Sequence, residues 1–153
     1  MLNKTILIPA LIAALGLAGN TNRLFAAEME EKGEKTETFQ TAATFAAAMK
    51  EIDTHYAEIP RLIAAGKLDD VHKEAAAVQY HALTLAKLAM AADSGVPHDN
   101  VKGINLTGKE LAGKFDAIDA AADAGKVPET KAVYDQMGTL IAKLKTLSGA
   151  ATK

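Results

Sequence analysis

Two of the four histidines in the sequence, His55 and His81, are the residues best placed to do chemistry. Imidazole nitrogen binds zinc, copper and iron, and the chain has no cysteine to supply a thiolate instead. If two helices fold back on each other at Gly66, residue 55 comes level with about residue 78, so His81 lies roughly one turn away. The sequence therefore predicts a metal site at His55 and His81.

Carboxylates stand close to both histidines along the predicted helices. Glu51 and Glu58 flank His55 at positions i−4 and i+3, and Glu74 lies one heptad before His81. Two imidazoles with neighbouring carboxylates can bind a divalent ion or copper. The alternative is that both histidines lie at the edge of the core and form ordinary hydrogen bonds to these glutamates. The identity of any ligand is therefore open.

The other histidines and the methionines give weaker candidates. His72 and His81 point to opposite sides of one helix, so His72 belongs on the polar face, and His98 lies in a predicted loop where solvation is expected. Met49 and Met137 fall on core faces, and a Met/His pair across a bundle is one way to hold non-covalent haem. The last helix has no histidine, however, and methionine at such positions usually fills the core.

No catalytic motif is recognisable in the sequence. It contains no G-x-S-x-G, no phosphate-binding glycine loop, and no nucleophile–base–acid arrangement. Glu-x-x-His, which a di-iron carboxylate protein needs on two helices, does not occur. We therefore expect a binding or structural protein rather than an enzyme.

Composition excludes several classes of partner. The formal charge of −2 and pI near 6.1 do not fit a nucleic-acid-binding protein, which needs a basic surface. The absence of cysteine excludes disulfides and covalent haem attachment through C-x-x-C-H. Alanine is abundant and aromatic residues make up only 5% of the chain, so the helices must approach one another closely.

The strongest helical pattern runs over Leu68–Ala92 and follows the turn at Gly66. Its apolar residues recur at alternating steps of four and three, which places them along one side of a helix: Val71, Ala75, Val78, Ala82, Leu85 and Ala89. A first helix is predicted from Thr38 to Gly66. Pro60 lies within it, so this helix either kinks near Glu58–Pro60 or stops and restarts.

The second half of the chain predicts two more helices. Asp93–Leu106 is rich in glycine, proline and asparagine and is expected to be a loop, either a long turn or a crossover. Thr107 has the spacing of a capping box and opens the third helix, which Gly125 closes. Pro128 lies in the first turn of the fourth helix, which continues to Leu147.

A short repeat organises these helices in pairs. Ala65-Gly66-Lys67 and Ala124-Gly125-Lys126 are the same tripeptide, and each lies between two amphipathic helices. The likeness is explained either by duplication or by the similarity of any two alanine-rich helical hairpins. In both cases the predicted fold is all-α: an antiparallel four-helix bundle made of two helical hairpins over residues 38–148.

The N-terminus predicts export. Lys4 is followed by an apolar run from Ile6 to Ala18, and residues 1–27 have the character of a secretory signal peptide, cleaved after Ala18 or near Ala26 and Ala27. The alternative is an uncleaved N-terminal anchor. Residues 28–37 are charged and predict a flexible tether. We expect a periplasmic or secreted protein without stable membrane insertion after cleavage.

The exported, alanine- and lysine-rich four-helix pattern resembles the periplasmic bundle superfamily that includes the b-type and c′-type soluble cytochromes. The resemblance covers Thr38–Leu147 and rests on the helix lengths, the Ala-Gly-Lys turns and the phrase Asp123-Ala124-Gly125-Lys126-Val127. It implies a four-helix bundle. The covalent haem motif is missing and the last helix has Tyr134 and Met137 but no axial histidine, so electron transfer does not follow from it.

Three functions remain open from the sequence. The first is an exported non-enzymatic binding protein that holds a metal ion at His55 and His81, or binds another protein or small ligand. The second is a periplasmic electron carrier with non-covalent haem. The third is a purely structural or interaction module. Alanine-rich faces also allow a homodimer, although no residue specifies one.

Overall fold

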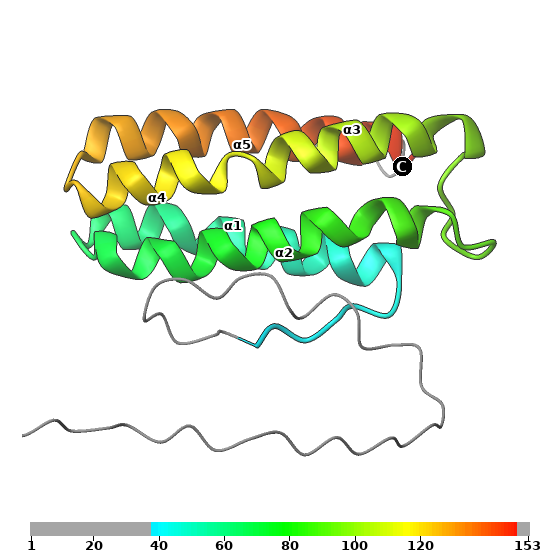
Figure 1. Ribbon diagram of the computed structural model, residues 1–153, viewed down its shortest axis with the longest axis horizontal. Helices are drawn as coiled ribbons and strands as arrows, with labels where there is room; N and C mark the ends of the chain where they lie inside the picture. The colour runs from blue at the N-terminus through cyan, green and yellow to red at the C-terminus, as the bar shows by residue number, and fades with distance from the viewer. Residues whose placement is uncertain (1–37, 150–153) are drawn as a thin grey trace, which may run out of the picture. The chain divides into compact units, whose positions relative to one another are not determined.

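A computed structural model describes residues 38–149, and this part of the chain is all-helical with no strand (Figure 1). The predicted signal peptide (1–27) and tether (28–37) lie outside the described residues. The α-helices are α1 (Phe45–Ala64), α2 (Val71–Ala89), α3 (Val101–Ala112), α4 (Phe115–Asp123) and α5 (Val127–Leu147). Only Gly113 and Lys114 separate α3 from α4, so the two together form the third of four helices in this region.

Helix α1 begins later than the sequence pattern predicts. Residues 38–44 are not helical, and Thr44 caps the helix by accepting a hydrogen bond from the Ala47 amide at 3.1 Å. A threonine hydroxyl in this position satisfies an amide that has no partner inside the helix. The predicted start at Thr38 is therefore wrong. Phe39 instead places its ring 5.6 Å from that of Tyr80 on α2.

Of the two alternatives predicted at Pro60, a kink or a stop, the stop is excluded, because α1 continues through Pro60 to Ala64. Proline removes one backbone donor from the helix interior, which costs stability by itself. Ile52 and Ile59, on the same helix, are completely buried. Burial of such a side chain contributes about 1.5–3 kcal/mol, which is enough to offset the lost hydrogen bond.

The two Ala-Gly-Lys turns have the same geometry, as their shared sequence predicts. Gly66 and Gly125 have φ of 69° and 68°, a left-handed conformation that glycine adopts without strain. The lysine amide after each glycine donates back into the preceding helix, Lys67 to Leu62 and Lys126 to Ala121, both at 2.9 Å. Each turn is thus a glycine helix cap that ends one helix and admits the next.

The predicted loop over Asp93–Leu106 is correct in its first part, where residues 93–100 lie outside any α-helix, and wrong in its last part. Helix α3 already begins at Val101, and Thr107 is buried within α3 rather than at its start.

Of the two glycines in this stretch, Gly95 lies in the loop with φ of 72°, whereas Gly103 lies within α3, where a Cβ would be 3.2 Å from the Leu147 side chain on α5. Gly108, further along α3, also serves close packing. A Cβ on Gly108 would lie 2.8 Å from the Ala82 carbonyl oxygen on α2. The absence of a side chain therefore lets α2 and α3 approach closely.

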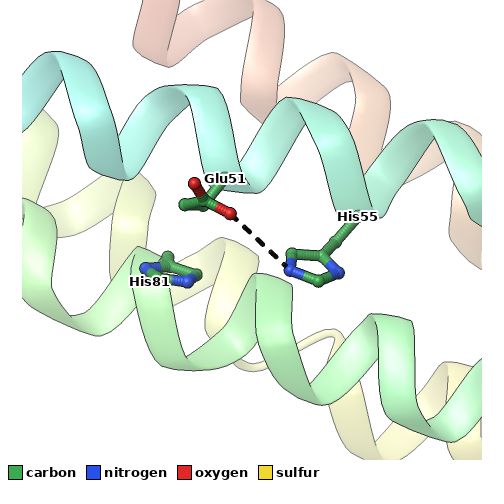
Figure 2. A group of neighbouring side chains, drawn as sticks. All are labelled: Glu51, His55 and His81. Atoms are coloured by element: carbon green, nitrogen blue, oxygen red, sulfur yellow. Dashed lines mark ion pairs between the residues drawn. The ribbon is translucent and has the colours of Figure 1, made fainter. Parts of the chain in front are cut away.

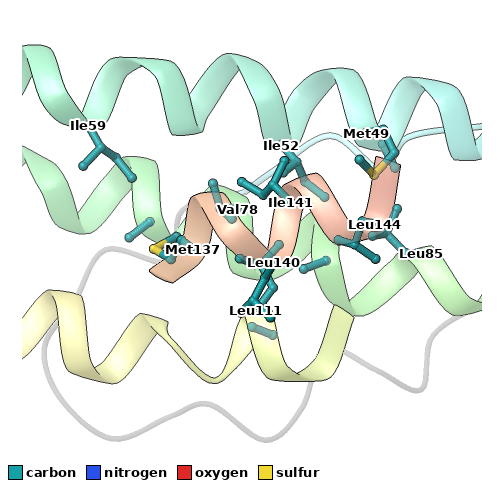
Figure 3. Packing of buried hydrophobic residues seen from close by; sticks show 14 of the residues in the cluster. Met49, Ile52, Ile59, Val78, Leu85, Leu111, Met137, Leu140, Ile141 and Leu144 are labelled. Carbon is teal, nitrogen blue, oxygen red and sulfur yellow. The ribbon is translucent and has the colours of Figure 1, made fainter. Parts of the chain in front are cut away.

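All five helical segments contribute to one hydrophobic core (Figure 3). In Figure 1, α1 and α2 lie side by side in one layer, and α3, α4 and α5 form the other. Stacked rings of Tyr56 and Tyr134, 4.3 Å apart, join α1 to α5, and the Tyr56 hydroxyl donates to the Tyr134 carbonyl. Within residues 38–149, no helix is long and apolar enough to cross a membrane.

Candidate metal centre

The structure brings Glu51, His55 and His81 together between α1 and α2 (Figure 2). We refer to these three residues as the Glu51–His55–His81 cluster. Glu51 and His55 are four residues apart on α1, so their side chains share one face of that helix. His81 comes from the facing side of α2, and its ring lies parallel to that of His55, with centroids 6.3 Å apart. The predicted pair of histidines is therefore a neighbouring pair.

His81 is the buried member of the cluster. His81 is only 2% exposed, and its Nδ1 is buried with no hydrogen-bond partner among the described residues. Burial lowers the pKa of His81 below 6.5, while the Glu51 carboxylate opposes this shift and His55 adds to it. The imidazole is therefore neutral at pH 7, which is the form that binds a metal ion.

His55 lies between two carboxylates. Its Nδ1 is 2.7 Å from Glu74 Oε2, and its Nε2 is 3.9 Å from Glu51 Oε2. The side chains of His55 and Glu74 are 25% and 18% exposed, whereas Glu51 is 46% exposed. The cluster therefore runs from the buried His81, through a half-buried His55, to a carboxylate that faces solvent.

The geometry of the cluster fits a small cation with nitrogen and oxygen ligands. One ligand atom from each residue lies within 4.8 Å of the other two. A zinc ion with ligands at about 2.0–2.1 Å holds those atoms about 3.3 Å apart. Side-chain rotations that move each ligand atom by about an ångström would therefore bring the three donors to zinc-binding distance. Two imidazoles and one carboxylate are a donor set used for zinc and for iron, and imidazole also suits copper.

The remaining predicted residues have other partners. His72 Nδ1 is 2.7 Å from Asp119 Oδ1 on α4, so His72 is half-buried in a hydrogen-bonded pair rather than on an open polar face. His98 is exposed, as expected. Glu58 pairs with Arg61 on the surface and does not take part in the cluster. Among residues 38–149, no other group of three potential ligands converges.

The methionines considered for haem are part of the core. Met49 and Met137 are 8% and 1% exposed and belong to the main hydrophobic cluster. A hollow of about 620 Å³ adjoins Met49 at the start of α1 and the end of α5. Its described lining includes Lys50, Asp53 and Lys145 but no histidine. This hollow does not provide the Met/His pair that the haem hypothesis needs.

The role of Glu74 is the part of the site that sequence reasoning missed. The sequence places Glu74 seven residues before His81 and assigns it to that histidine, whereas the structure pairs it with His55 on the other helix. The predicted register did not decide the choice, because it places Glu51, Glu58 and Glu74 all near the histidines. Residue 55 lies between the levels of Glu74 and His81, as expected for a position opposite residue 78.

Comparisons with protein-family models, curated proteins and solved structures give no match to this chain.

Proposed function

We propose that the protein is an exported, non-enzymatic metal-binding protein. Its described part is best interpreted as an antiparallel four-helix bundle of two hairpins, α1–α2 and α3/α4–α5, and its ion is held between the helices of the first hairpin. Zinc, copper and iron are the ions that suit the donors. Location in the periplasm or outside the cell follows from residues 1–27 as they appear in the sequence.

The proposal is carried by one observation: a buried imidazole with an unpartnered nitrogen stands within 4.8 Å of a second imidazole and a carboxylate. Leaving a buried polar atom without a partner costs about 1–3 kcal/mol. A cation bound at Nδ1 of His81 removes this cost by accepting the lone pair of that atom. The lowered pKa of His81 also reduces proton competition for that lone pair near neutral pH.

Metal titration tests the proposal. The purified protein, freed of metal by a chelator, is dialysed against Zn²⁺ and, separately, against Cu²⁺. We expect about one ion per chain, and His55→Ala and His81→Ala to weaken binding by about 100-fold or more. His72→Ala is the matched control, because it removes a histidine that is also paired with a carboxylate, and it should leave binding unchanged.

The same experiment separates the rival functions. Stoichiometric metal in both cluster variants, or no metal in the wild type, contradicts the proposal and favours a structural or interaction module. A Soret band in the protein as purified would favour the haem-dependent electron carrier instead.

A further inference from the structure

We infer that Glu74 is the positioning residue of the metal centre: it holds His55 in the tautomer that presents Nε2 to the ion. This inference deepens the proposed function and rests on it. Glu74 lies on α2, one helix away from His55, and its Oε2 is 2.7 Å from His55 Nδ1. That contact is the shortest polar one that either residue makes within the described chain.

The direction of this hydrogen bond follows from the chemistry of its two groups. An ionised carboxylate has acceptor oxygens only, so Nδ1 of His55 must carry the proton and donate it. In a neutral imidazole the other nitrogen then has the lone pair. Glu74 therefore fixes Nε2 as the only nitrogen of His55 available to a metal ion.

The geometry of the cluster requires that same nitrogen. Nε2 of His55 is the atom that faces Glu51, at 3.9 Å from its Oε2, and Figure 2 shows this contact directed into the space that His81 also borders. If the tautomer were reversed, Nε2 would carry a proton and point it at the ion. Orientation of His55 by Glu74 is thus a condition for all three donors to act together.

The partial burial of Glu74 strengthens its hold on His55. Its side chain is 18% exposed and that of His55 is 25% exposed, so water competes poorly for the bond. A carboxylate that accepts the distal N–H of a metal-bound histidine also raises the basicity of that ligand. Loss of such a partner typically weakens metal binding by 10–100-fold without removing the site.

Two measurements on the full chain test the inference. The first is the tautomer of His55 in the metal-free protein, read from ¹⁵N NMR of the imidazole nitrogens at about pH 8, where unperturbed imidazole is neutral. The second is the affinity for Zn²⁺. We compare wild type with Glu74→Ala, and with Glu74→Gln, which keeps an acceptor oxygen for the Nδ1–H of His55.

We expect the wild type to hold His55 as the Nδ1–H tautomer and Glu74→Ala to lose this preference. Zn²⁺ affinity should fall by about 10–100-fold in Glu74→Ala, with about one ion still bound at saturation, and by less in Glu74→Gln. Asp119→Ala is the matched control. It breaks the other histidine–carboxylate bond of 2.7 Å, and it should change neither the His55 tautomer nor the affinity.

The outcomes distinguish this inference from the proposed function. If the wild type binds Zn²⁺ and Glu74→Ala binds it equally well, or if wild-type His55 is the Nε2–H tautomer, Glu74 has no positioning role although the metal site stands. If the wild type binds no metal but keeps a Glu74-dependent Nδ1–H tautomer, the proposed function fails and the orientation of His55 by Glu74 is upheld.

Discussion

Helix α2 takes part in two histidine–carboxylate pairs that look alike and have different surroundings. Glu74 of α2 binds His55 of α1, and His72 of α2 binds Asp119 of α4, each through Nδ1 at 2.7 Å. The exposed fractions are also similar, at 25% and 18% in the first pair and 29% and 24% in the second. The hydrogen bond alone therefore does not distinguish the proposed metal centre from a structural contact.

The neighbouring rings make the difference. His55 stacks against His81, whose nitrogen is buried and unpartnered, and has Glu51 one helical turn away. His72 has its ring edge against Phe115, 5.2 Å away, and a phenyl ring offers no ligand for zinc. The comparison teaches that a metal site needs convergent donors on the far side of the oriented imidazole. Three predictions follow from this contrast, in decreasing order of effect.

Zinc should stabilise the protein through the first pair only. At a free Zn²⁺ concentration 100 times Kd, binding to the native state adds about 2.7 kcal/mol to the free energy of unfolding. For a domain of this size we expect Tm to rise by roughly 10 °C. The rise should vanish in His81→Leu and persist in His72→Leu. Differential scanning calorimetry measures this rise in Tm. An equal rise in both variants would show that zinc does not bind at the first pair in preference to the second.

Replacing the two histidines by leucine should change the stability of the metal-free protein in opposite directions. His81→Leu removes a buried unpartnered nitrogen, so we expect a gain of about 1 kcal/mol. His72→Leu leaves the half-buried Asp119 without this partner, so we expect a loss of about 1 kcal/mol. Urea unfolding in the presence of a chelator gives both values. Destabilisation by His81→Leu would mean that His81 stabilises the hydrophobic core and is not kept there for metal binding.

The smallest effect concerns pH. The pKa of His81 is lower in the folded protein than its ordinary value of 6.5, so the unfolded chain binds a proton at a higher pH than the native one. The neutral imidazole therefore makes its full contribution to the free energy of unfolding above about pH 6.5, and this contribution is lost as pH falls below that value. Glu51 and His55 are the titratable groups that influence the pKa of His81. Stability of the metal-free wild type should fall between about pH 7 and pH 5, and His81→Leu should flatten this slope; equal slopes contradict the prediction.

Much of the helical content was predictable, because the apolar periodicity of α2 and the two Ala-Gly-Lys turns are local signals. The start of α1 was not, because Phe39 fits the helical pattern but packs against Tyr80 from a segment that precedes the cap at Thr44. The start of α3 was missed for a related reason. Gly103 helped to predict a loop over Asp93–Leu106, and its place within α3, against the Leu147 side chain of α5, is decided only by packing.

The candidate site was predictable as far as helix register determines it. Folding back at Gly66 brings His55 near His81, and that proximity is present in the structure. The choice between carboxylates was not accessible, since Glu51, Glu58 and Glu74 all lie near the histidines in register. Side-chain direction and burial decide it: Glu58 turns to Arg61, and Glu74 crosses to His55.

Anomalous X-ray scattering from crystals of the zinc-loaded protein tests the central claim most directly. We predict a single strong peak between α1 and α2, with Glu51, Nε2 of His55 and a nitrogen of His81 each about 2.0–2.2 Å from the ion. A peak at His72 and Asp119, or at the exposed His98, with none at the Glu51–His55–His81 cluster, would contradict the account.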